Sequence, residues 1–172
     1  MNKVSRLEQL ANFLLYVALQ LTVVRVIVFA HTACFIYVAF LLLLPRGQKG
    51  LISHLFIGFF VGLLVDLFYH SIGVHAFASV LMVYSRTLLL KLMLPTGSYE
   101  SAIQPTLRNL GWQRFSLFSL LLISVHHIAL FFLEANNILL FFVVMRRAIL
   151  STLSTYVAVL LMQSMVLLIN KK

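Results

Sequence analysis

Long apolar runs separated by short polar intervals make up almost the whole chain. A helix needs about 20 apolar residues to cross the hydrocarbon core of a bilayer, and most runs after residue 50 have about this length. The run over 10–44 is too long for one such helix and slightly short for two, and the last run, over 138–169, is also too long for one. The pattern predicts an all-α integral membrane protein with about six membrane-spanning helices, at approximately 9–26, 29–44, 51–69, 74–94, 111–133 and 148–169.

Basic residues predict the orientation of these helices. Lys and Arg are enriched in the cytoplasmic loops of membrane proteins; Lys3 and Arg6 precede the first run, and Arg46 and Lys49 follow it. If both pairs are cytoplasmic, an even number of crossings separates them, which favours two short or tilted helices. The same rule places both termini and the polar loop at 95–109 in the cytoplasm. The basic residues in and beside that loop, which we expect to contact filaments or lipid, are Lys91, Arg108 and Arg114.

Arg146 and Arg147 divide the last apolar run. We expect the sixth helix to follow from residue 148, while three paths remain open for the segment 138–147: it can lie along the outer face of the membrane, re-enter it or extend the last helix. The two arginines then lie on the outer side, against the charge rule, where their long side chains can reach lipid headgroups.

Composition excludes a water-soluble protein. Of the 172 residues, 62% are hydrophobic and 10% are charged, and the mean hydropathy is +1.05, whereas soluble domains carry about 25% charged residues. A disordered chain is excluded for the same reason, and the single cysteine, Cys34, cannot form an internal disulfide. The formal net charge is +9. We interpret the basic residues as charges that are retained at the cytoplasmic face of the membrane and contact anionic lipid, and not as a nucleic-acid-binding surface.

Small residues and one acid form a stripe on the third predicted helix. Gly58 and Gly62 make a GxxxG motif, which lets another backbone approach closely in lipid. Asp66 follows at the next i+4 position, on the same face. This stripe is expected to pack against the chain's own bundle or against a partner's span. Gly73, which can adopt a positive φ, closes the turn that follows.

Asp66 is the only carboxylate deep within an apolar run, so it must be paired, neutral or directed into a wet cavity. Counting about 1.5 Å per residue along each helix predicts a polar layer in the outer third of the bundle. Its members are Asp66, His75, His126, His127, Arg146 and Arg147.

Three interpretations of this layer remain open at this point. It can be a buried hydrogen-bond network that fixes helix register, or a pathway for a ligand or for protons. The third is a metal site built from Asp66, His70, His75 and His126, although their spacing matches no recognised metal signature.

The fourth predicted helix carries His75, Ser79, Met82 and Arg86 on one face. We interpret this face as a buried polar seam from which Arg86 reaches the inner headgroups. The sequence contains no glycine-rich phosphate loop, no nucleophile beside a placed base and no paired catalytic carboxylates. We therefore expect neither an enzyme nor a bound cofactor.

Several motifs are distinctive in their order and spacing. They are Gly58-x3-Gly62-Leu63-Leu64-x-Asp66-Leu67, Gly73-x-His75-Ala76, Leu110-Gly111-Trp112, Val125-His126-His127 and Phe131-Phe132-Leu133-Glu134. Together they resemble the sequences of the MreD family, the rod shape-determining membrane proteins, and the resemblance covers nearly the whole chain.

The resemblance implies a role that composition cannot show. MreD-like proteins are multi-pass subunits of the cell-elongation machinery in the bacterial inner membrane. They bind MreC, a protein with one span, and through it they connect with MreB filaments, RodA and a class B penicillin-binding protein. The implied function is non-catalytic scaffolding of lateral peptidoglycan synthesis. The implied fold is a compact bundle similar to the substrate-binding subunits of energy-coupling-factor transporters.

Two other functions are compatible with the sequence. A substrate-binding subunit of a vitamin-type transporter would need a closed cavity on the outer side, at the level of the polar layer. A protein that binds lipid or a lipid-linked wall precursor would place phosphates against the outer arginines, and this role can coexist with scaffolding.

Overall fold

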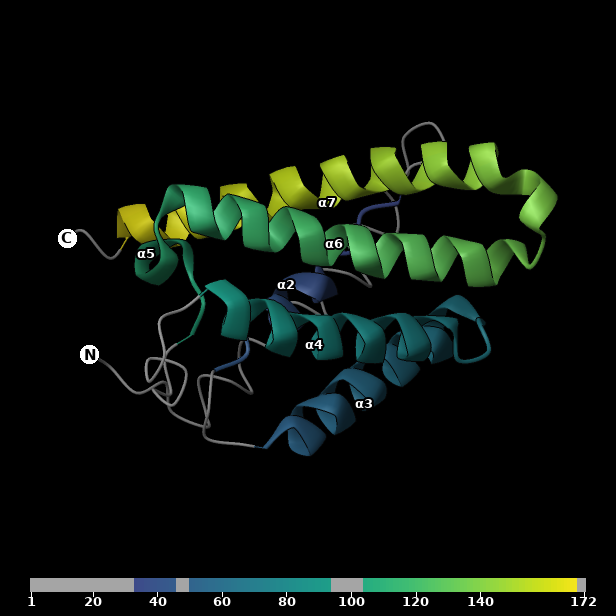
Figure 1. Ribbon diagram of the computed structural model, residues 1–172, viewed down its shortest axis with the longest axis horizontal. Helices are drawn as coiled ribbons and strands as arrows, with labels where there is room; N and C mark the ends of the chain where they lie inside the picture. The colour runs from purple at the N-terminus through teal and green to yellow at the C-terminus, as the bar shows by residue number, and fades with distance from the viewer. Residues whose placement is uncertain (1–32, 46–49, 94–103, 170–172) are drawn as a thin grey trace.

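Helices form every element of the described chain. The computed structural model describes residues 33–45, 50–93 and 104–169 (Figure 1). The elements are α2 (Tyr37–Leu42), α3 (Leu51–Tyr69), α4 (Val74–Met93), α5 (Leu107–Leu110), α6 (Trp112–Ala135), a 3₁₀ helix (Ile138–Leu140) and α7 (Phe141–Ile169). Within these residues, four segments are long and apolar enough to cross a membrane: α3, α4, α6 and the stretch Ile138–Leu168. The chain is therefore a helical membrane protein.

The long helices form two antiparallel hairpins, α3–α4 and α6–α7, which meet where α4 packs against α6 (Figure 1). The turns of both hairpins lie at the same end of the molecule, and α5 lies at the opposite end, beside the last turns of α7. The short helix α2 lies between the two hairpins and contacts both α4 and α6.

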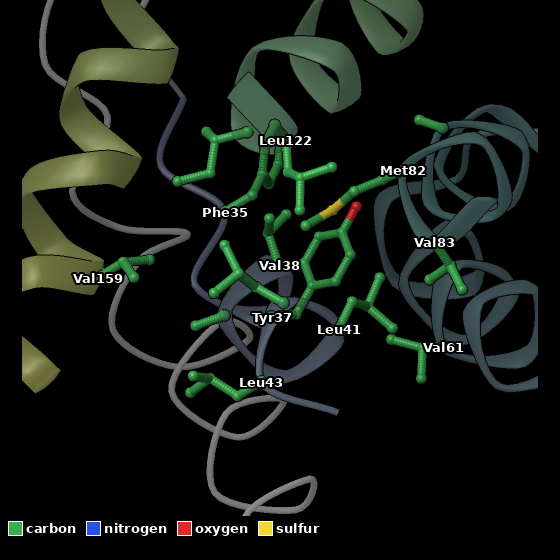
Figure 2. Packing of buried hydrophobic residues seen from close by; sticks show 14 of the residues in the cluster. Phe35, Tyr37, Val38, Leu41, Leu43, Val61, Met82, Val83, Leu122 and Val159 are labelled. Carbon is green, nitrogen blue, oxygen red and sulfur yellow. The ribbon is translucent and has the colours of Figure 1, made fainter. Parts of the chain in front are cut away.

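The second predicted helix is only partly present in the described residues. Where the sequence predicts a continuous helix over 29–44, the described part contains only the six residues of α2, and residues 33–36 precede it without regular structure. Every α2 residue except Phe40 is almost fully buried, as expected for a helix that is apolar on all sides. In Figure 2, Tyr37 and Leu41 extend from α2 toward Met82 of α4. The first predicted helix, 9–26, lies outside the described residues.

Of the three paths left open for the segment 138–147, the structure has the one in which most of it extends the last helix, so the predicted helix start at residue 148 is wrong. After the 3₁₀ turn, α7 runs without interruption through Arg146 and Arg147 and on to Ile169. No glycine or proline occurs between 138 and 169, and arginine is a good helix former whose long side chain can point away from the bundle. With 29 residues, α7 is about 43 Å long.

The α3–α4 hairpin depends on close backbone contact at the glycines of the stripe. A Cβ atom on Gly62 would lie 2.5 Å from the His75 carbonyl oxygen and 2.5 Å from the Ala76 Cα. At Gly58 the nearest atom would be a side-chain methyl of Val83, at 3.0 Å. These contacts place the stripe inside the chain's own hairpin.

Gly73 has a different role from the other two glycines. Its φ is +74°, and a Cβ there would meet nothing within 4 Å. His70, which ends α3, is also left-handed, with φ 55°. The turn conformation, not packing, therefore requires glycine at position 73.

Gly62→Ala is expected to destabilise the protein by about 2 kcal/mol or more, because the new methyl group meets α4 backbone that cannot move aside cheaply. Gly58→Ala is the matched control and should cost less, because a Cβ there would lie 3.0 Å from a Val83 methyl group and 3.2 Å from the Ser79 carbonyl oxygen, both longer than the 2.5 Å contacts at Gly62. Unfolding of the purified proteins in detergent micelles measures both effects. An equal loss of unfolding free energy in the two variants would contradict this account of the contact between α3 and α4.

Candidate functional site

The Asp66 carboxylate caps the N-terminus of the neighbouring helix. Its Oδ1 accepts hydrogen bonds from the His75 backbone N–H, at 3.0 Å, and from the Ser71 hydroxyl, at 2.5 Å. Its Oδ2 accepts from the Ala76 backbone N–H, at 2.9 Å. The first N–H groups of a helix have no partner within that helix, and a negative charge is favourable at this end. The only carboxylate deep in an apolar run thus completes the backbone bonding of α4.

Neither arginine of the predicted polar layer lies with Asp66, so this part of the prediction is wrong. Arg147 pairs with Glu134 of α6 at 3.3 Å, and its guanidinium carbon lies 4.7 Å from the centre of the Phe131 ring. Arg146 is exposed on α7. Counting residues gave their level along the helix but not the side of the helix from which they project.

Histidines of two long helices meet at one tyrosine. The Tyr37 hydroxyl oxygen lies 2.9 Å from His75 Nδ1 and 2.7 Å from His126 Nε2. A hydroxyl has one proton to donate, so it donates to one imidazole and accepts an N–H from the other. All three side chains are buried. The bridge joins α2, α4 and α6 at the centre of the molecule.

A second chain of hydrogen bonds starts at His127 and ends on the irregular segment before α2. His127 Nδ1 bonds the Ile123 carbonyl at 2.9 Å, so Nδ1 carries the proton and Nε2 accepts from the Thr155 hydroxyl at 3.3 Å. The Thr155 oxygen in turn accepts the Phe35 backbone N–H at 3.0 Å. One turn earlier on α7, Ser151 accepts the Ala33 backbone N–H, also at 3.0 Å.

Arg86 caps the other end of the same segment. It is 1% exposed, and its guanidinium donates to the carbonyl oxygens of Leu42, at 3.0 Å, and Leu44. His54 Nε2 bonds the next carbonyl, that of Pro45, at 3.1 Å. The expectation that Arg86 reaches the inner headgroups is wrong, because the last carbonyls of α2 need donors inside the bundle.

The centre of this network is filled by side chains. The Phe35 ring lies 5.1 to 6.1 Å, between centroids, from the rings of Tyr37, Tyr69, His75, His126 and His127. His126 Nδ1 is the one buried ring nitrogen for which the described residues supply no partner. The arrangement can hold helices in register, and its two bridged imidazoles can exchange a proton through the Tyr37 hydroxyl.

The proposed metal ligands do not converge. Over the described residues, no group of three or more His, Cys, Asp or Glu side chains is placed to hold a metal ion. The Asp66 oxygens bind N–H and O–H donors, His75 and His126 each bond Tyr37, and His70 is exposed at the turn.

The basic residues of the predicted cytoplasmic loop lie at one end of the molecule. Lys91 is in the last turn of α4, Arg108 is in α5 and Arg114 is in the first turn of α6, and all three are exposed. This end is opposite the two hairpin turns (Figure 1). Most of the loop itself, over 95–103, lies outside the described residues.

Sequence reasoning missed Tyr37, Ser151 and Thr155. The i, i+4 spacing of Ser151 and Thr155 on one helix face was a signal for a polar contact, but nothing local indicated that their partners are more than 100 residues earlier in the chain. Tyr37 is an aromatic residue in an apolar run, and nothing in the sequence around it indicates that its hydroxyl bonds two histidines.

Comparison of the chain with protein-family models, with curated proteins and with solved structures gave no match.

Asp66→Asn is expected to lower the free energy of unfolding by about 2 kcal/mol, because the amide nitrogen cannot accept a backbone N–H and the charge is lost. The control is Glu134→Gln, the same chemical change at a half-exposed ion pair, which should cost about 0.5 kcal/mol or less. Unfolding in detergent micelles distinguishes them, and an Asp66 effect no larger than the Glu134 effect would refute the capping role.

Tyr37→Phe is expected to cost about 1–3 kcal/mol, since removing one oxygen leaves two buried imidazole nitrogens without their partner. Tyr84→Phe removes the same atom from a tyrosine that is 54% exposed, and it should leave the unfolding midpoint nearly unchanged. If both substitutions lower the stability to unfolding by the same small amount, the Tyr37 bridge does not hold the helices together.

Proposed function

We propose that the chain is an MreD-like, non-catalytic membrane subunit of the bacterial cell-elongation machinery that binds an MreC-like single-span protein. The observation that supports this most is that the residues of its distinctive motif meet at one joint. Gly62 contacts the first turn of α4, Asp66 bonds the backbone of His75 and Ala76, and Gly73 closes the turn. Residues used in this way hold a helical hairpin in shape, which is a structural role.

Scaffolding through lipid-facing surfaces is consistent with the rest of the described chain. The outward face of α3 carries large exposed apolar side chains, among them Phe56, Phe60 and Leu67. Because the glycine stripe already packs against α4, a partner's span would meet a face of this kind. In this proposal both termini are in the cytoplasm, the membrane is the bacterial inner membrane, and RodA, a class B penicillin-binding protein and MreB join in a larger complex.

The vitamin-transporter alternative would place a substrate at the polar layer. The polar atoms that would recognise it are largely bonded to one another and to backbone, and aromatic rings fill the space between them. This favours the scaffold over the transporter subunit.

Affinity purification of the tagged chain from its native membrane in mild detergent, read by mass spectrometry, tests the proposal. Recovery of an MreC-like protein together with RodA or a penicillin-binding protein is the expected result, with untagged membranes as the control. Recovery of transporter ATPases and a coupling subunit instead would contradict it.

A further inference from the structure

Arg146 is a cation within an exposed apolar stripe. On α7 its neighbours at i−4, i+3 and i+4 are Phe142, Ile149 and Leu150, and they are 85%, 54% and 44% exposed. Arg146 itself is exposed. A guanidinium surrounded by hydrocarbon needs an anion or a route to the headgroups.

The adjacent arginine shows what such a group requires. Arg147 has the Glu134 carboxylate at 3.3 Å and the Phe131 ring beneath it. For Arg146, the described residues provide no carboxylate, since the ion pair of Glu134 is with Arg147. Side chains on a helix lean toward its N-terminus, so the Arg146 guanidinium is directed toward the end with the hairpin turns.

An apolar groove begins one turn further along α7. It lies between α6 and α7, measures about 170 Å³, is open on one side, and is lined by Leu120, Ser124, Ile128, Ala148, Ile149, Thr152 and Leu153. The Ser124 hydroxyl donates its proton to the Leu120 carbonyl of its own helix, so this proton is not available to an occupant. About 150 Å³ is enough for an apolar molecule the size of benzene.

We propose that α6 and α7 together bind one anionic, phosphate-bearing lipid, with its phosphate on Arg146 and part of a hydrocarbon chain in the groove. The charge of Arg146 favours an anionic lipid as the occupant, because its guanidinium lies among apolar side chains and arginine forms bidentate hydrogen bonds with phosphate. Ile149 connects the two parts of the site, since it lines the groove and lies at i+3 from Arg146. This site is independent of the proposed scaffold function.

Native mass spectrometry of the purified chain, with phosphatidylglycerol or phosphatidylcholine of the same acyl chains added, tests the site. The wild type should bind phosphatidylglycerol about fivefold more tightly, the effect expected of one interfacial basic residue. Arg146→Gln should remove this preference. Arg114→Gln, which removes an exposed arginine at the opposite end, should preserve it. Ile149→Trp, which fills the groove, should weaken binding of both lipids.

Other outcomes would overturn the proposal. If the preference survives Arg146→Gln, or if Arg114→Gln abolishes it equally, the attraction is not specific to this site. If Ile149→Trp changes the binding of neither lipid, or if millimolar inorganic phosphate displaces phosphatidylglycerol completely, the groove does not hold the hydrocarbon chain of the lipid. Circular dichroism and gel filtration of each variant confirm that it is folded, and the assay needs no partner protein.

Discussion

Backbone N–H and C=O groups that lie outside helices must find partners inside the protein when hydrocarbon surrounds it. The segment that contains α2 enters the bundle as irregular chain and leaves it as irregular chain, so it creates this need at both ends. Ser151 and Thr155 accept its first N–H groups, and Arg86 and His54 donate to its last carbonyls. Asp66 does the same for the start of α4. The buried polar side chains of α3, α4 and α7 are thus positioned by the backbone they complete.

This constraint also limits the chemistry of the molecule. A histidine or carboxylate in a membrane span is ordinarily a candidate for a substrate or ion pathway. Here Asp66 has three donors, and His75 and His126 share the Tyr37 hydroxyl. The network fixes where α2, α4, α6 and α7 lie relative to one another. Helices held together in this way are consistent with the proposed scaffolding function, in which lipid-facing surfaces meet partner spans.

The sequence predicted the parts of the fold that depend on local pattern. Helix α3 has the predicted bounds and α4 starts where expected, because turn residues separate two apolar runs of spanning length. The need to satisfy Asp66 was also predictable, but its partners were not, since two of the three are backbone N–H groups that no residue type reveals. Buried irregular chain is as apolar as a helix, so 33–36 read as helical. Its partners on α7 lie 118 and 120 residues away.

Hydrogen–deuterium exchange of the segment 33–45, read by mass spectrometry on the purified wild type and on Thr155→Val, tests the central claim most directly. The account predicts that this segment exchanges as slowly as the middle of α6 although much of it is not helical. In Thr155→Val its exchange should accelerate around Phe35 while α6 stays protected. Exchange of the wild-type segment at the rate of solvent-exposed chain would contradict the claim that helix side chains satisfy this backbone inside the bundle.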